Sequence, residues 1–157
     1  MMKKILFFMV SLVFVILLGF NKKNPSIIIG CTAEFTMMKN IGVNELKNKL
    51  NYNMNVNLFF YDNNKGFALF SGVADFSGQR YLINREVRFS YTDLDNDGLH
   101  TLKYTKIVKG HSDTTTEDLW ANILDVSRNL YISLNQLPGD LYLIKSLQTP
   151  EFVCNKT

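Results

Sequence analysis

The stretch that decides the fold is Tyr81-Leu82-Ile83-Asn84-Arg85-Glu86-Val87-Arg88-Phe89-Ser90-Tyr91, in which polar and apolar residues alternate. Successive side chains of a β-strand point to opposite faces of the sheet. One face carries Tyr81, Ile83, Arg85, Val87, Phe89 and Tyr91, and the other carries Asn84, Glu86, Arg88 and Ser90. The pattern predicts a long strand with one buried face, and it places Arg85 on that face.

Similar runs lie on both sides of this strand. Residues 55–61 and 67–76 precede it and residues 99–108 follow it, with turn signals between them that contain Gly66, Gly78 and Gly98. Consecutive strands joined by short turns predict an antiparallel meander. A glycine inside the second run, Gly72, predicts a bulge or bend.

The remaining elements complete the predicted fold class, which is mainly β (α+β). Residues 31–39 are expected to form the first strand, and residues 43–50 a short helical turn. The sequence Thr114-Thr115-Thr116-Glu117 fits a capping box, with Asp113 and Thr115 as competing helix caps. Strands are expected at 130–134 and 141–147, the latter closing the sheet. We therefore expect one antiparallel β-sheet or small barrel with one packed α-helix.

An uncharged apolar run at residues 5–20 precedes this domain, with lysines on both sides. The run is slightly short for the roughly 30 Å hydrocarbon core, and snorkelling lysines can close the gap. We expect an uncleaved transmembrane helix, because Lys22 and Lys23 follow the run directly where a cleavable signal would have small residues. The predicted organisation is a cytoplasmic tail at 1–4, an anchor at 5–20, a linker at 21–30 and a periplasmic domain at 31–157.

Two cysteines, Cys31 and Cys154, bracket that domain. An even count outside the cytoplasm predicts one disulfide and an oxidising compartment. The alternative is that Ile28-Ile29-Gly30-Cys31 is a lipobox and that Cys31 is acylated, although charged residues interrupt the apolar region before it.

The sequence offers little catalytic chemistry. Asp93-Leu94-Asp95-Asn96-Asp97-Gly98 begins like a calcium loop, but Tyr104 stands where a bidentate glutamate is needed, which favours a hairpin turn. His100 and His111 lack metal-ligand neighbours and are candidates for pH sensing. No nucleophile motif or P-loop occurs, and the net charge is only +3. We therefore expect neither an enzyme nor a cofactor, metal or direct nucleic-acid contact.

Three residues are candidates for contact with a ligand or partner: Arg85, Tyr81 and Trp120. For Arg85 two interpretations stay open. It either pairs with a carboxylate at the barrel edge or points into an apolar interior, where it would meet an anionic ligand.

The arrangement of Cys31, the Tyr81–Tyr91 strand, Asp113-Thr114 and Cys154 resembles the FidL-like family of small bacterial inner-membrane proteins, and within it the PsaF and MyfF accessory proteins, which are similar in role to ToxS. The resemblance implies a single-pass inner-membrane protein that pairs with a membrane-anchored winged-helix transcription activator. Its periplasmic domain would stabilise the activator's periplasmic tail in a heterodimer, and so affect fimbrial or other virulence genes in response to an environmental signal. It also implies that the domain can bind a small amphipathic ligand.

Two other functions remain alternatives. The domain could be an autonomous lipocalin-like module that binds a bile salt or fatty acid. It could also be an envelope lipoprotein acylated at Cys31.

Overall fold

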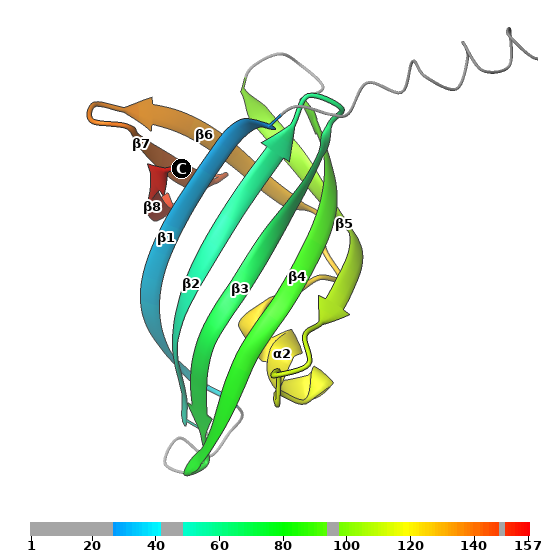
Figure 1. The fold of residues 1–157 in the computed structure, drawn as a ribbon, viewed down its shortest axis with the longest axis vertical. Helices are drawn as coiled ribbons and strands as arrows, with labels where there is room; N and C mark the ends of the chain where they lie inside the picture. The colour runs from blue at the N-terminus through cyan, green and yellow to red at the C-terminus, as the bar shows by residue number, and fades with distance from the viewer. Residues whose placement is uncertain (1–26, 42–48, 94–97, 148–149) are drawn as a thin grey trace, which may run out of the picture.

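The computed structural model describes residues 27–41, 49–93, 98–147 and 150–157. These residues form a closed antiparallel barrel of eight strands in chain order (Figure 1). The elements are β1 (Ile27–Asn40), β2 (Lys49–Tyr61), β3 (Lys65–Phe76), β4 (Gln79–Asp93), β5 (Leu99–Lys109), α2 (Glu117–Ile123), β6 (Leu130–Leu137), β7 (Leu141–Ser146) and β8 (Pro150–Lys156).

The barrel interior follows from the alternation of each strand. In β2, Tyr52, Met54, Val56, Leu58 and Phe60 are buried, and the residues between them are more exposed. In β4, the face predicted to be buried is indeed turned inward, from Ile83 to Tyr91. The predicted meander is confirmed, because each of these strands pairs with the next one along the chain.

The barrel is unevenly closed. Strands β1 to β5 pair along most of their length, but β5 meets β6 at only four residue pairs and β1 meets β8 at only two. In Figure 1, β6, β7 and β8 lie beside the upper part of the long sheet, and α2 lies beside its lower part. One half of the barrel is therefore closed by strands, while the helix covers the other half.

Helix α2 presents one short apolar face to the barrel. Its buried residues are Leu119 and Trp120, and the Trp120 ring meets Phe70 of β3 edge-on at a centroid distance of 5.3 Å. The helix begins after both expected caps, Asp113 and Thr115. Thr116 is the N-cap, and its hydroxyl accepts a hydrogen bond from the Leu119 backbone N–H. Neither Asp113 nor Thr115 caps the helix, because both side chains contact Arg85 instead.

The α+β fold class was wrong. The described residues are nearly all β, and α2 has only seven residues. The first strand begins at Ile27, inside the predicted linker. The strand at 141–147 does not close the sheet, because β8 follows it and pairs with β1. No register shift occurs at Gly72. Instead, the β2 backbone approaches this glycine so closely that an added Cβ would clash with the Asn53 carbonyl oxygen.

Three other predictions fall on residues outside the described ranges. The anchor at 5–20 lies there, as does most of the helical turn at 43–50, although Lys49 and Leu50 begin β2. The tip of the predicted hairpin turn at 94–97 also lies there, and the strands that it joins pair as expected. Among the described residues, no helix has the length and apolarity needed to cross a membrane.

Candidate ligand cavity and open seam

The barrel encloses a cavity of about 490 Å³. All eight strands and the C-terminal end of α2 contribute side chains to its wall, and most of these are apolar, among them Val56, Phe70, Val87, Leu102 and Ile132. Binding sites for small molecules have volumes of about 300–1,000 Å³ and walls that are mainly apolar. The cavity therefore has the size and character of a ligand site.

The cavity reaches solvent where its lining residues are exposed. These residues are Thr36 and Met37 of β1, Asp125 after α2, and Glu151 of β8. Asp125 and Glu151 are the only charged residues in the lining, and no described lysine, arginine or histidine belongs to it. The mouth of the cavity is thus bordered by two carboxylates.

Two tyrosines bring hydroxyl groups to this wall. The Tyr52 hydroxyl donates to the Met37 sulfur at 2.8 Å. Burial, with a smaller effect of the nearby Asp125 charge, raises the pKa of Tyr104 to about 12. The pKa of Asp125 is itself lowered, chiefly by the hydrogen bond from the Ser127 hydroxyl, so this carboxylate is charged at neutral pH.

Beside the cavity, the seam between β1 and β8 is closed by few contacts. Its two residue pairs are Cys31 with Lys156 and Thr32 with Asn155. Farther along, the rings of Phe35 and Phe152 stack at a centroid distance of 6.0 Å where a strand ladder would otherwise continue. This region, from Ala33 to Asn40 of β1, is called the open seam below.

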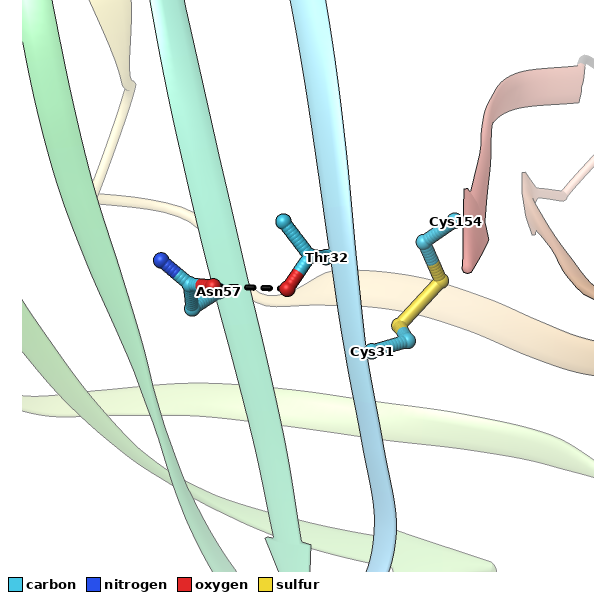
Figure 2. Close-up of a disulfide and its surroundings, with 4 residues drawn as sticks. All are labelled: Cys31, Thr32, Asn57 and Cys154. Atoms are coloured by element: carbon cyan, nitrogen blue, oxygen red, sulfur yellow. Dashed lines mark hydrogen bonds between the residues drawn. A yellow bond between two sulfur atoms is a disulfide. The ribbon is translucent and has the colours of Figure 1, made fainter. Parts of the chain in front are cut away.

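A disulfide between Cys31 and Cys154 holds the closed end of the seam (Figure 2). Both cysteines are fully buried, and their Cα atoms are 5.5 Å apart. The neighbouring Thr32 hydroxyl points away from the bridge and donates to the Asn57 side-chain oxygen of β2 at 2.7 Å. The predicted disulfide is confirmed.

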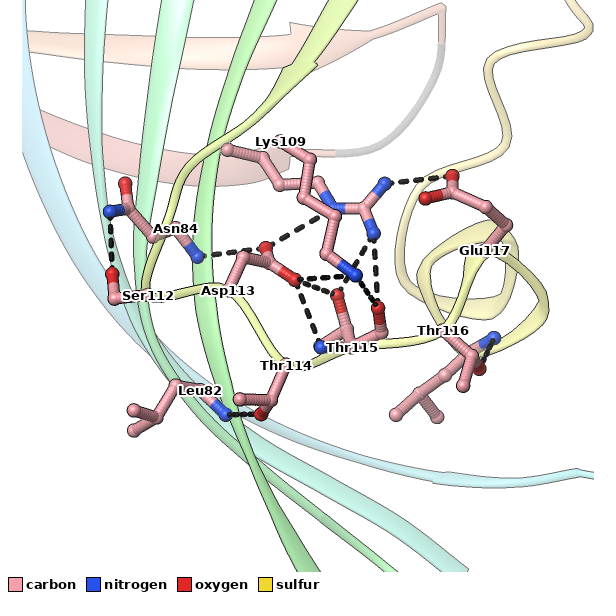
Figure 3. Close-up of polar contacts among 11 residues, drawn as sticks. Leu82, Asn84, Lys109, Ser112, Asp113, Thr114, Thr115, Thr116 and Glu117 are labelled. Atoms are coloured by element: carbon pink, nitrogen blue, oxygen red, sulfur yellow. Dashed lines mark hydrogen bonds and ion pairs between the residues drawn. The ribbon is translucent and has the colours of Figure 1, made fainter.

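A second group of polar residues connects β4 to the segment before α2 (Figure 3). Arg85 is only 2% exposed, and its guanidinium donates to the Asp113 carboxylate at 3.2 Å and to the Glu117 carboxylate at 2.8 Å. It also donates to the hydroxyl and carbonyl of Thr115. The Asn84 backbone N–H donates to Asp113. We call this group the Arg85 cluster.

The charged groups of the Arg85 cluster stabilise one another in their ionised forms. Burial alone would lower the pKa of Arg85, but the Glu117 hydrogen bond and the Asp113 charge raise it. Burial alone would raise the pKa of Asp113, yet hydrogen bonds from Thr115 and Asn84 and the Arg85 charge lower it. The pKa of Glu117 is lowered, first by its hydrogen bond to Arg85. All three groups are therefore ionised at neutral pH.

The candidate contact residues lie outside the cavity lining. Arg85 and Trp120 come together, with the guanidinium 5.0 Å from the centre of the indole ring. The ion pairs of Arg85 with Asp113 and Glu117 agree with the interpretation that it pairs with carboxylates. Tyr81 donates its hydroxyl to Gln79 at 2.9 Å. A ligand or partner contact by any of the three stays a prediction.

The two histidines are not brought together. His100 is the second residue of β5, and its ring meets the Tyr91 ring edge-on at a centroid distance of 5.6 Å, whereas His111 lies in an exposed turn beyond the other end of β5. Within the described ranges, no group of His, Cys, Asp and Glu side chains could hold a metal ion.

The sequence indicated ligand binding by the barrel only through the family resemblance and as an alternative function, and it identified none of the residues that line the cavity. The alternation of β2 carries part of the signal, because it turns Tyr52, Met54, Val56 and Leu58 inward. Alternation reports which side chains point inward, but not whether they fill the space between the strands.

The family model described as "FidL-like putative membrane protein" matches residues 72–154 of this chain. The matched stretch contains the whole Arg85 cluster and Cys154, and it ends at that cysteine. A comparison with curated proteins finds none that matches.

Proposed function

This chain belongs to the FidL-like family of membrane proteins, and from that premise we propose that it is the accessory subunit of a membrane-anchored winged-helix transcription activator. Its barrel domain holds the periplasmic tail of the activator and stabilises it. Through the activator it affects fimbrial or other virulence genes. The finer likeness to PsaF and MyfF remains a prediction.

The proposal places the protein at the inner membrane, with residues 5–20 crossing the membrane once and the barrel in the periplasm. The disulfide supports this side of the membrane, because disulfides persist in oxidising compartments. Two proteins confined to one bilayer have a high effective concentration, so a weak contact between their periplasmic domains is enough to pair them.

The observation that carries the proposal is the open seam. The Gly30 carbonyl accepts a hydrogen bond from the Thr157 N–H, so the polar backbone groups of Gly30 face β8. The backbone N–H and C=O groups of successive residues point to opposite sides of a strand. Those of Glu34, Thr36 and Met38 therefore face the β8 side of β1, as those of Gly30 do. The ladder between β1 and β8 stops at Thr32. A strand of a partner can therefore add to β1 at this edge.

Proline substitutions at the seam test this docking mode. Glu34→Pro and Met38→Pro together remove two backbone donors that face the seam and leave the donors that face β2. At about 0.5–1.5 kcal/mol for each hydrogen bond, binding should weaken by roughly 1–3 kcal/mol. The measurement is recovery of the activator when the tagged full-length chain is purified from membranes that contain both proteins.

The matched control is the Glu34→Ala and Met38→Ala double variant, which loses the same side chains but keeps both donors. It should retain the activator, and thermal unfolding should show both variants folded. Equal recovery with the proline and alanine variants would reject docking at the seam. Unchanged activator level and output after deletion of this chain would reject the accessory function itself.

The cavity favours a second candidate function, an autonomous module that binds a small amphipathic ligand. Its volume and apolar wall suit this role, and a closed eight-stranded barrel is compatible with a lipocalin-like fold. Binding of a small amphiphile to the full-length protein without any partner would support it.

The lipoprotein alternative is not supported. The Cys31 sulfur is bonded to Cys154, and a sulfur in a disulfide cannot carry an acyl group. Mass spectrometry under non-reducing conditions distinguishes the bridge from an acylated Cys31. That the protein has no enzymatic activity stays a prediction. The same holds for pH sensing by His100 and His111.

A further inference from the structure

We propose that the barrel cavity binds a mostly apolar molecule whose polar end carries no negative charge. The inference rests on the second candidate function, ligand binding by the barrel, and is independent of the activator partner. It narrows the ligand class, because bile salts and fatty-acid anions are then poor ligands.

An anion in the cavity finds no cation among the described residues of its wall. Arg85, the buried cation of the barrel, is not in the lining and already binds two carboxylates. Near the mouth, Lys39 donates to the Asn122 carbonyl at 3.1 Å, and Arg128 pairs with Asp125 at 3.2 Å. An anionic group that leaves water for an apolar cavity needs a positively charged partner, and no lysine, arginine or histidine of the described residues lines this one.

The charged groups in the described part of the wall repel an anion. The charged groups of the described lining are the carboxylate of Asp125, with which Arg128 pairs from outside the lining, and that of Glu151, so the head of a fatty-acid anion would meet like charges in the wall itself. An uncharged hydroxyl meets no such repulsion. It can donate a hydrogen bond to a carboxylate or exchange one with the Tyr104 hydroxyl.

The raised pKa of Tyr104 also indicates that the cavity wall disfavours a negative charge. Its hydroxyl lies in the wall, and burial together with Asp125 disfavours its phenolate form. Burial raises the pKa of the other lining tyrosine, Tyr52, as well. The same surroundings would disfavour a ligand carboxylate at this depth.

Three probes with the same alkyl tail separate head charge from hydrophobicity: dodecanol, dodecanoate and dodecyltrimethylammonium. The full-length protein, held in a nonionic amphipol, is titrated at neutral pH below the micelle concentrations, with the amphipol alone as the blank. Binding is followed by calorimetry and by fluorescence of Trp120, the single tryptophan, whose ring touches the lining residue Phe70. We expect dodecanol to bind at least about tenfold more tightly than dodecanoate, since only the anion meets like charge without a counter-ion.

The double variant Asp125→Asn and Glu151→Gln should bind dodecanoate more tightly than the wild type does. The difference in affinity between dodecanol and dodecanoate should therefore become smaller. The control is Asp75→Asn, which removes an exposed carboxylate outside the lining and should change nothing. Dodecanoate binding as tightly as dodecanol to the wild type would overturn the charge preference but leave ligand binding standing. Binding of none of the three probes would overturn both. Neither result bears on the activator, which co-purification tests separately.

Discussion

Replacing Asp113 by alanine should destabilise the barrel far more than the same change at Glu117. Both carboxylates bind the guanidinium of Arg85, at 3.2 and 2.8 Å. They differ in burial, because the Asp113 side chain is fully buried whereas that of Glu117 is 73% exposed. The pair therefore compares the same charge and the same partner in two environments.

The magnitude follows from burial. Removing one partner of a buried ion pair costs about 3–5 kcal/mol, because the remaining charge stays in a poorly solvated site. Asp113→Ala also leaves the N–H groups of Asn84 and Thr115 without their acceptor. Solvent screens the Glu117 contact, so Glu117→Ala should cost no more than about 1 kcal/mol. A typical domain is stable by about 5–15 kcal/mol, so the first loss is a large fraction of the total.

Urea unfolding monitored by Trp120 fluorescence measures both losses, since this side chain is 2% exposed in the folded barrel. The double variant Arg85→Met and Asp113→Leu should recover much of the stability lost in Asp113→Ala, because it leaves no buried charge. Equal midpoints for Asp113→Ala and Glu117→Ala would refute this reasoning. A double variant no more stable than Asp113→Ala would also refute it.

Three further predictions concern the bridge and the titrating groups. Cys31→Ser should lower the free energy of unfolding by about 5 kcal/mol in the chain-entropy model, since the cysteines are 123 residues apart; equal urea midpoints for oxidised and reduced protein would contradict this. The lowered pKa of Asp113 stabilises the fold above the ordinary carboxyl pKa of about 4, and this contribution is lost as the pH falls through the folded-state value. Asp113→Ala should therefore lose less stability to acid than the wild type, as measured by urea unfolding across that range. The raised pKa of Tyr104 stabilises the fold below about pH 10, and this contribution is lost as the pH rises through about 12. Ultraviolet titration of Tyr104→Phe should lack one ionisation near pH 12, and an unchanged titration would show that another tyrosine carries it.

Local patterns predicted most of the strands, because alternation depends on near neighbours in the chain. The buried face of β4 is correct for this reason, as are the turns on either side of it. Strand β8 was missed although it closes the barrel. Its seven residues follow β7 directly, and its partner β1 lies more than a hundred residues earlier. Short-range pattern carries no information about such a pairing.

The candidate site was predictable in kind but not in arrangement. An arginine on a buried strand face requires carboxylates, and the structure supplies Asp113 and Glu117. Their identity could not be read from sequence, because both lie about 30 positions away in the segment that leads into α2. The Thr116 cap was misassigned for the same reason, since Asp113 and Thr115 contact Arg85 instead. The disulfide was predictable because only one pair of cysteines exists.

Closure by β8 also sets an order of events during synthesis. Cys31 and Cys154 are 123 positions apart. At about 5–20 residues per second, a ribosome needs roughly 6 to 25 seconds to travel between them. Through that interval the β8 side of β1 has no strand of its own chain to pair with, and the Cys31 thiol has no partner cysteine. A strand of another protein made nearby thus has several seconds to reach this edge before intramolecular closure can compete with it.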